Sequence, residues 1–154
     1  MSPRRYKHRV FRMSDMKRVV RILMVDDDRD DLFLTEICFR QTSLPVEFVA
    51  LESAEALFAY IKDNGIGSID VLLLDLNMPV TNGLETLKVL KSYPHYSELS
   101  VFMFSTSAHA EHRLESLNSG ARGYINKPSS LNQMKAFVEE IGQCLKEKEL
   151  SMAG

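Results

Sequence analysis

The 154 residues predict one α/β domain, a doubly wound parallel sheet of five strands with helices on both faces. Short aliphatic runs alternate five times with segments whose apolar residues recur at helical spacing. Strict alternation of this kind favours a parallel sheet in which each strand is followed by a helix. Several of the aliphatic runs end directly in polar side chains, at the edge of the sheet where open α/β folds bind their ligands.

Five runs of aliphatic and aromatic residues have the pattern of strands buried on both faces. The third run is the clearest, because Val71 and three leucines lead directly into Asp75. Pro79 then forces a turn, since proline fixes its own φ and disfavours helix in the residue before it. In chain order, the expected strands are Val19–Val25, Val46–Leu51, Val71–Asp75, Val101–Phe104 and Gly123–Asn126.

Each strand is followed by a segment with helical spacing. Ser53 is expected to cap the second helix, and Gly120 to end the fourth as the residue after its C-cap. Leu114 and Leu117 of the fourth helix are expected to face inward. The segment from Ser130 to Gln133 has the spacing of a capping box before the fifth helix. In chain order, the expected helices are Asp30–Gln41, Ala54–Lys62, Leu84–Leu90, Ala108–Ser119 and Leu131 to about Cys144.

The charge is divided unevenly along the chain. Residues 1–21 hold eight of the 19 Lys and Arg but one of the 21 Asp and Glu, so 11 basic and 20 acidic residues remain from Ile22 onward. An acidic domain does not favour nucleic-acid binding, which cationic contacts to phosphate dominate. Residues 1–18 lack the apolar core of a secretory signal, so we expect a mobile basic extension, a domain over 19–146 and a short tail over 147–154.

The two cysteines, Cys38 and Cys144, fall on expected helices without Cys-x-x-Cys spacing. They are therefore expected to be reduced thiols in a cytoplasmic protein. No apolar run is long enough to span a membrane, so we expect no membrane contact.

Acidic side chains follow the first and third strands. Three adjacent carboxylates, Asp26 to Asp28, repel one another and need a cation beside them. Asp26, Asp27 and Asp75 supply oxygen ligands that suit Mg²⁺ or Mn²⁺, and the backbone carbonyl of Asn77 is placed to add another. Asp28 exceeds the pair that this site needs and is interpreted as loop charge.

Ser105 follows the fourth strand and Lys127 the fifth. If the strand order is 2-1-3-4-5, these groups and the acids converge on one crevice. A carboxylate such as Asp75 beside a metal ion can attack a phosphoryl group to give an aspartyl phosphate. Lys127 and the Ser105 hydroxyl would contact its oxygens, and the new charge, roughly −1.5 to −2, could draw both side chains inward as a switch.

The motifs at the strand ends resemble the receiver domain of two-component response regulators, the superfamily of the chemotaxis regulator CheY. Asp75 to Ser105 spans 30 residues and Ser105 to Lys127 spans 22, intervals that suit this family. The similarity covers roughly Arg21 to Leu145 and implies the flavodoxin-like (βα)5 strand order 2-1-3-4-5. The motifs that carry it are Val25-Asp26-Asp27, Leu74 to Gly83, Phe104 to Ala108 and Gly120 to Pro128.

The resemblance implies a role for each matched residue. Asp75 would be the phosphoacceptor and Lys127 its cationic contact. Asp26 and Asp27 would form the Mg²⁺ pocket with Asp75 and the Asn77 carbonyl. Ser105 and Tyr124 would be the switch pair. Asn77 and Ser107 would occupy positions that tune the lifetime of the phosphoryl group. The bond between Lys127 and Pro128 would be cis.

The same resemblance implies partners and an output. The donor would be the phosphohistidine of a sensor histidine kinase, and the receiver would catalyse its own transfer and hydrolysis without being an enzyme. Only ten residues follow Cys144, so we expect no DNA-binding or diguanylate-cyclase domain in this chain. Output would be a contact through the fourth helix, fifth strand and fifth helix, a face through which similar regulators also form homodimers. Asp30 to Thr35 is similar to single-domain regulators that pair with bacterial phytochromes.

Three other functions fit part of the pattern. A haloacid-dehalogenase-type phosphatase also uses an aspartate nucleophile with Mg²⁺, but its second acid would stand at Asn77. A calcium loop fits the alternation of Asp26, Asp28 and Asp30, but not the residues at its sixth and twelfth positions. A receiver that acts only as an adaptor, without phosphorylation, would have no need of the complete set of chemical residues.

Overall fold

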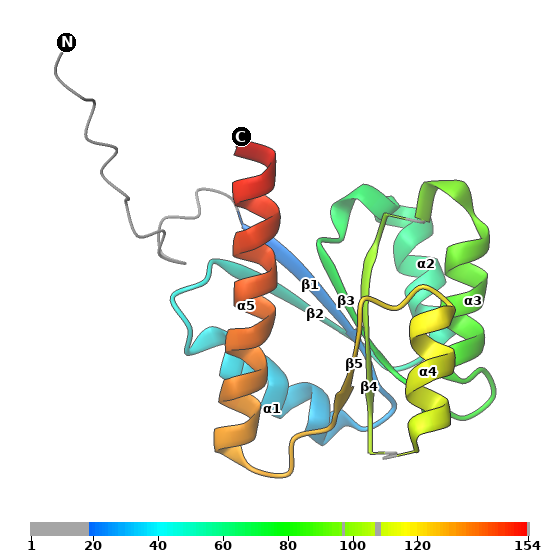
Figure 1. Cartoon of the computed structure of the whole chain (residues 1–154), viewed down its shortest axis with the longest axis horizontal. Coiled ribbons are helices and arrows are strands. Elements are labelled where there is room, and N and C mark those ends of the chain that lie inside the picture. The colour runs from blue at the N-terminus through cyan, green and yellow to red at the C-terminus, as the bar shows by residue number, and fades with distance from the viewer. Residues whose placement is uncertain (1–18, 97, 107–108, 154) are drawn as a thin grey trace, which may run out of the picture.

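Five parallel strands form one sheet in the order β2-β1-β3-β4-β5 (Figure 1), as the family resemblance implies. The computed structural model describes residues 19–96, 98–106 and 109–153, with side chains through residue 147. The expected basic extension and Ser107 lie outside these residues. The strands are β1 Val20–Val25, β2 Val46–Leu51, β3 Val71–Asp75, β4 Ser100–Ser105 and β5 Gly123–Asn126.

A helix follows each strand, and the expected caps at two helix starts are present. Ser53 accepts a hydrogen bond from the Ala56 N–H, and Ser130 accepts one from the Gln133 N–H. The last helix is longer than predicted, because Lys and Glu after Cys144 are strong helix formers that continue it. The helices are α1 Arg29–Arg40, α2 Ala54–Asn64, α3 Gly83–Ser92, α4 Ala110–Asn118 and α5 Leu131–Ala153, with short 3₁₀ turns at Ile66–Ser68 and Pro94–Tyr96.

The sheet is covered on both faces, so its core has two halves (Figure 1). Ile22 and Met24 of β1 face α1 and α5, where Phe39 and Phe137 meet edge to face with ring centroids 6.4 Å apart. The alternate residues of β1, β3 and β4 pack against α2 and α3. Because both faces are apolar, the polar side chains of these strands gather at the strand ends.

Helix α4 packs differently from the prediction. Leu114 and Leu117 were expected to face inward, but they are 61% and 37% exposed, so that prediction is wrong. The buried side is polar instead, with Ser116 fully buried and His112 and Ser119 half-buried. The reason is that α4 lies over the short strand β5, which offers little apolar surface for leucines to cover.

No helix within the described ranges is both long and apolar enough to cross a membrane.

Candidate functional site

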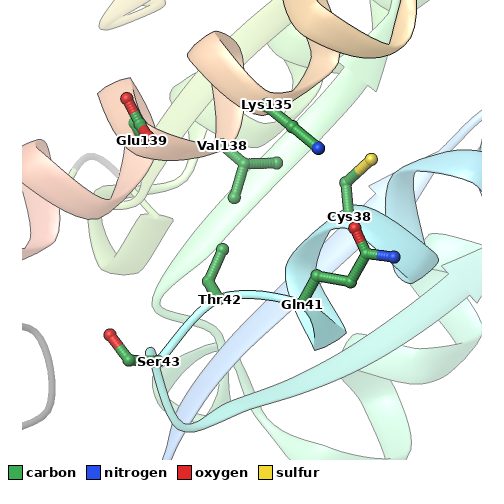
Figure 2. Close-up of a pocket in the computed structure, with 7 residues that line it drawn as sticks. All are labelled: Cys38, Gln41, Thr42, Ser43, Lys135, Val138 and Glu139. Atoms are coloured by element: carbon green, nitrogen blue, oxygen red, sulfur yellow. The ribbon is translucent and has the colours of Figure 1, made fainter.

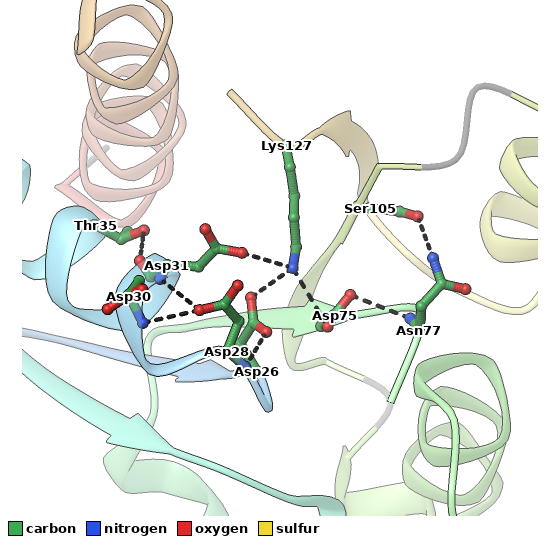
Figure 3. A network of polar contacts seen from close by, with 9 residues as sticks. All are labelled: Asp26, Asp28, Asp30, Asp31, Thr35, Asp75, Asn77, Ser105 and Lys127. Atoms are coloured by element: carbon green, nitrogen blue, oxygen red, sulfur yellow. Dashed lines mark hydrogen bonds and ion pairs between the residues drawn. The ribbon is translucent and has the colours of Figure 1, made fainter. Parts of the chain in front are cut away.

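The carboxyl edge of the sheet brings together the side chains that the sequence places at strand ends (Figure 3). Asp26 follows β1 and Asp75 ends β3, and these two strands are hydrogen-bonded neighbours. Ser105 ends β4 beside β3, and Lys127 follows β5 beside β4. The structure therefore confirms that these four side chains converge on one edge of the sheet.

Lys127 joins the two buried acids to helix α1. Its Nζ lies 2.8 Å from Asp26 Oδ2, 2.9 Å from Asp31 Oδ2 and 3.4 Å from Asp75 Oδ2. The lysine side chain is only 13% exposed, and burial alone would lower its pKa. Contacts with Asp26 and Asp31, and the charge of Asp75, outweigh burial and raise the pKa of Lys127. The ammonium therefore stays charged at the centre of the site.

Asp26 and Asp75 are held in the same way. One oxygen of each, Oδ1, accepts a hydrogen bond from the backbone two residues on, at 2.9 Å from Asp28 N and 3.1 Å from Asn77 N. Burial, and then the charge of Asp26, raise the pKa of Asp75 to about 7, although Lys127 and the Asn77 N–H act in the opposite direction. The raised pKa means that the Asp75 carboxylate is short of nearby positive charge.

The geometry fits a divalent cation. Oxygens of Asp26, Asp27 and Asp75 lie within 4.8 Å of one another, and Asp27 is exposed where the other two are buried. Asp26 Oδ2 is buried without a hydrogen-bond partner, since the Lys127 ammonium is close but not aligned for a hydrogen bond. A buried carboxylate oxygen with a free lone pair is a ready ligand for Mg²⁺ or Mn²⁺.

The two residues expected to act as a switch lie on adjacent strands. Ser105 is fully buried, and its Oγ accepts a hydrogen bond of 3.2 Å from Asn77 Nδ2. Tyr124 lies on β5 opposite Met103 and packs, half-buried, against the α2 and α3 half of the core. Asn77 therefore links the end of β3, where Asp75 lies, to the end of β4.

Two acids of this site were misjudged or missed from the sequence. Asp28 is not mere loop charge, because its side chain caps α1 by accepting from the N–H groups of Asp30 and Asp31. Asp31 was not predicted, yet it contacts Lys127 across 96 residues of sequence. Its position in the first turn of a helix that starts at the carboxyl edge was the available signal. The calcium loop is also excluded, because α1 begins at Arg29, inside the loop that it would need.

The loop after Asp75 depends on Gly83, the first residue of α3. A Cβ at this position would lie 2.0 Å from the Asp75 carbonyl oxygen, so only glycine fits. The Gly83 N–H also donates to the Leu76 carbonyl at 2.9 Å. Helix α3 therefore starts directly against the end of β3 and fixes the backbone that carries Asp75.

The bond between Lys127 and Pro128 is trans, so the expected cis bond is wrong for this structure. The expectation came from the resemblance alone, and trans is the lower-energy form of an X-Pro bond. Lys127 is nevertheless anchored, because its N–H donates to the Ser105 carbonyl at 2.7 Å.

A hollow of about 400 Å³ lies away from this edge, between the end of α1 and helix α5 (Figure 2). Cys38, Thr42, Lys135 and Val138 are among the residues that line it. Burial raises the pKa of the Cys38 thiol. None of the acids at the carboxyl edge lines this hollow, so it is separate from the candidate site.

Comparison with known proteins now decides the family. Residues 22–139 match the model of the response regulator receiver domain. The chain belongs to this family. The prediction of a receiver domain of the two-component response regulators is therefore confirmed.

Relatives of known sequence and structure agree with this family. The transcriptional regulatory protein PrrA of Mycobacterium tuberculosis is 31% identical over 121 residues, which are 79% of this chain and 49% of PrrA. The chain thus spans about half the length of the curated relatives it matches.

Two solved structures are similar to the whole receiver. The phosphorylated cyanobacterial phytochrome response regulator RcpA is 28% identical with a TM-score of 0.72, covering 80% of this chain and 91% of that one. The Mn²⁺-bound response regulator Rcp1 is 25% identical with a TM-score of 0.69, covering 79% and 91%.

Proposed function

We propose that this receiver accepts a phosphoryl group on Asp75 from the phosphohistidine of a sensor histidine kinase, with Mg²⁺ or Mn²⁺ as cofactor. The observation that carries the proposal is the position of Asp75, buried at the sheet edge within reach of Asp26, Asp27 and Lys127. The phosphorylated state of RcpA and the Mn²⁺ bound to Rcp1 support it by similarity.

The transfer follows from the groups around Asp75. A carboxylate oxygen of Asp75 attacks phosphorus, a P–O bond forms, and the P–N bond to the kinase histidine breaks with imidazole as the leaving group. Lys127 donates to the phosphoryl oxygens as the ammonium already close to Asp75. A divalent cation held by Asp26, Asp27, Asp75 and the Asn77 carbonyl would neutralise charge on the transferring oxygens. The receiver acts as a phosphoacceptor that catalyses its own transfer and hydrolysis, and is not an enzyme with a separate substrate.

The output of phosphorylation would pass through Ser105. A phosphoryl group brings roughly −1.5 to −2 charges to the end of β3. The Ser105 hydroxyl, whose Oγ accepts a hydrogen bond from Asn77 Nδ2, would turn its O–H toward the phosphoryl group and donate to one of its oxygens. Tyr124 would then repack on β5. The face of α4, β5 and α5 already exposes Leu114 and Leu117, which suits a homodimer or a protein target.

The kinase proposed for this receiver is a bacteriophytochrome or a similar sensor or hybrid kinase. The similarity to RcpA, a phytochrome response regulator, supports this assignment. Transfer from such a kinase, measured side by side with transfer from an unrelated histidine kinase, tests it: faster labelling by the phytochrome-type kinase is expected, and equal rates would contradict it.

Intact-protein mass after incubation with acetyl phosphate tests the phosphoacceptor directly. With Mg²⁺ present we expect a gain of one phosphoryl group, which a chelator abolishes. Asp75→Asn should gain none, whereas Asp63→Asn, a matched change of an exposed acid on α2, should behave as the wild type. A wild type that gains no phosphoryl group, or an Asp75→Asn variant that gains one, would contradict the proposal and favour an adaptor without phosphorylation.

A further inference from the structure

Helix α1 contributes a carboxylate to the site that no receiver motif in this sequence contains. Asp31 Oδ2 lies 2.9 Å from Lys127 Nζ, as close as the 2.8 Å contact with Asp26 and closer than the 3.4 Å contact with Asp75 (Figure 3). The contact with Asp31 is also a hydrogen bond that Lys127 Nζ donates. The lysine is therefore held as firmly by α1 as by the strand ends.

Two cations would have to share the carboxylates of this site. Asp26, Asp27 and Asp75 have the spacing for a divalent cation. Asp26 and Asp75 also contact the Lys127 ammonium. Each cation then has one acid of its own, Asp27 for the metal ion and Asp31 for the lysine.

The backbone fixes Asp31 in this position independently of the lysine. Its N–H points to Asp28 Oδ1 at 3.4 Å, in the capped first turn of α1. Its carbonyl accepts a hydrogen bond of 2.7 Å from the buried hydroxyl of Thr35. The Asp31 side chain is 34% exposed, so its carboxylate remains partly hydrated while it contacts the lysine.

We propose that Asp31 is a positioning residue that keeps Lys127 beside the site while a divalent cation occupies Asp26 and Asp75. A metal ion takes the charge of these two acids and repels the ammonium. Asp31 then remains as the partner of Lys127 and leaves the lysine next to Asp75, ready for a phosphoryl oxygen. Without Asp31, Lys127 has only the shared acids and competes with the metal ion for them.

This inference rests on the metal site of the proposed function, and its test is the affinity for Mg²⁺, measured by calorimetric titration of the folded receiver. We expect Asp31→Asn to raise the Kd for Mg²⁺ about tenfold. Asp30→Asn is the matched control, because it removes the same charge from the same helical turn at an exposed residue. It should change the Kd less than about twofold, and Asp31→Glu should restore the wild-type affinity.

A second pair of variants tests whether Asp31 affects the Kd for Mg²⁺ through Lys127 or only through its own negative charge. In a Lys127→Met background, a change of Asp31 to Asn should leave the Kd within about twofold. The proposal is overturned if Asp31→Asn and Asp30→Asn weaken binding equally, if Asp31→Glu remains as weak as Asp31→Asn, or if the tenfold effect persists without Lys127. The comparisons of Asp31→Asn with Asp30→Asn and with Asp31→Glu both keep Lys127. They therefore test the proposal even if Lys127→Met folds poorly.

The same titration distinguishes this inference from the function beneath it. If Asp27→Ala abolishes Mg²⁺ binding but Asp31→Asn has no effect, the metal site stands and the role of Asp31 fails. If the wild type binds no Mg²⁺, both fail together.

Discussion

The two halves of the site are held in place very differently. On the side of β1, β3 and α1, the Lys127 ammonium contacts three carboxylates, and backbone N–H groups hold both buried acids. Helix α1 on this side is capped by the Asp28 side chain. On the side of β4, β5 and α4, Ser105 accepts from Asn77, and His109, the N-cap of α4, makes no capping hydrogen bond with its side chain.

The helices that border the two halves differ in the same way. Helix α1 buries Leu32, Cys38 and Phe39 in the core. The one fully buried residue in the described part of α4 is Ser116, and its hydroxyl has no hydrogen-bond partner. The half with α1 holds charged side chains in place, whereas the half with α4 buries fewer side chains, so we expect it to change conformation at lower energetic cost.

The largest effect is expected from removing the charge of Asp75, which lies on the side of β1, β3 and α1. The pKa of Asp75 is raised to about 7 in the folded receiver, above the unfolded value near 4. The folded state therefore binds more protons between these values, and its stability falls as pH rises from about 4 to 7.

Asp75→Asn should accordingly raise the free energy of unfolding by about 2–4 kcal/mol at pH 8 in metal-free buffer, and several-fold less at pH 4. Urea denaturation of both proteins at the two pH values measures it. Equal stability of the two proteins at pH 8 would contradict this prediction, because it would mean that the buried charge of Asp75 does not destabilise the folded state.

A smaller effect is expected from replacing Asp27, which is the exposed residue among the three acids placed to bind a metal ion. Asp27→Ala should raise the Kd for Mg²⁺ at least about tenfold, because it removes one of the oxygen ligands. The control is Asp63→Ala, an exposed acid on α2 that should leave the Kd unchanged. A titration of Asp27→Ala that matches the wild type would remove Asp27 from the site.

The smallest effects are expected from removing one buried hydroxyl on each side of the site, that of Thr35 on α1 and that of Ser116 on α4. Thr35 on α1 donates to the Asp31 carbonyl at 2.7 Å, so Thr35→Val should cost about 1 kcal/mol of stability. Ser116 on α4 has a buried hydroxyl without a partner, so Ser116→Ala should be neutral or stabilising by about 1 kcal/mol. Thermal unfolding measures both, and a Ser116→Ala variant less stable than Thr35→Val would reverse the comparison.

The sequence was most informative where hydrophobic pattern and backbone chemistry agree. The strand ends at Asp26, Asp75 and Ser105 follow from aliphatic runs that stop at a polar residue, and the strand order came from the family resemblance. Periodicity alone failed at α4, because Leu114 and Leu117 could not reveal that the adjoining strand is short and offers them little apolar surface.

Long-range contacts were the other limit of the sequence. Asp31 could not be paired with Lys127, since the contact joins residues 96 positions apart and depends on where the first turn of α1 points. Asp28 was underestimated for a simpler reason, as its capping role follows from local helix chemistry that the sequence already contained.

Hydrogen exchange of the resting and the phosphorylated receiver tests the division into two halves most directly. Backbone amides of α1, β1 and β3 should keep the same protection in both states, because Lys127 and the capped turn of α1 hold them. Peptides from α4 and β5 should change their exchange rates on phosphorylation with acetyl phosphate and Mg²⁺. A change confined to α1, or the same change in both halves, would contradict this account.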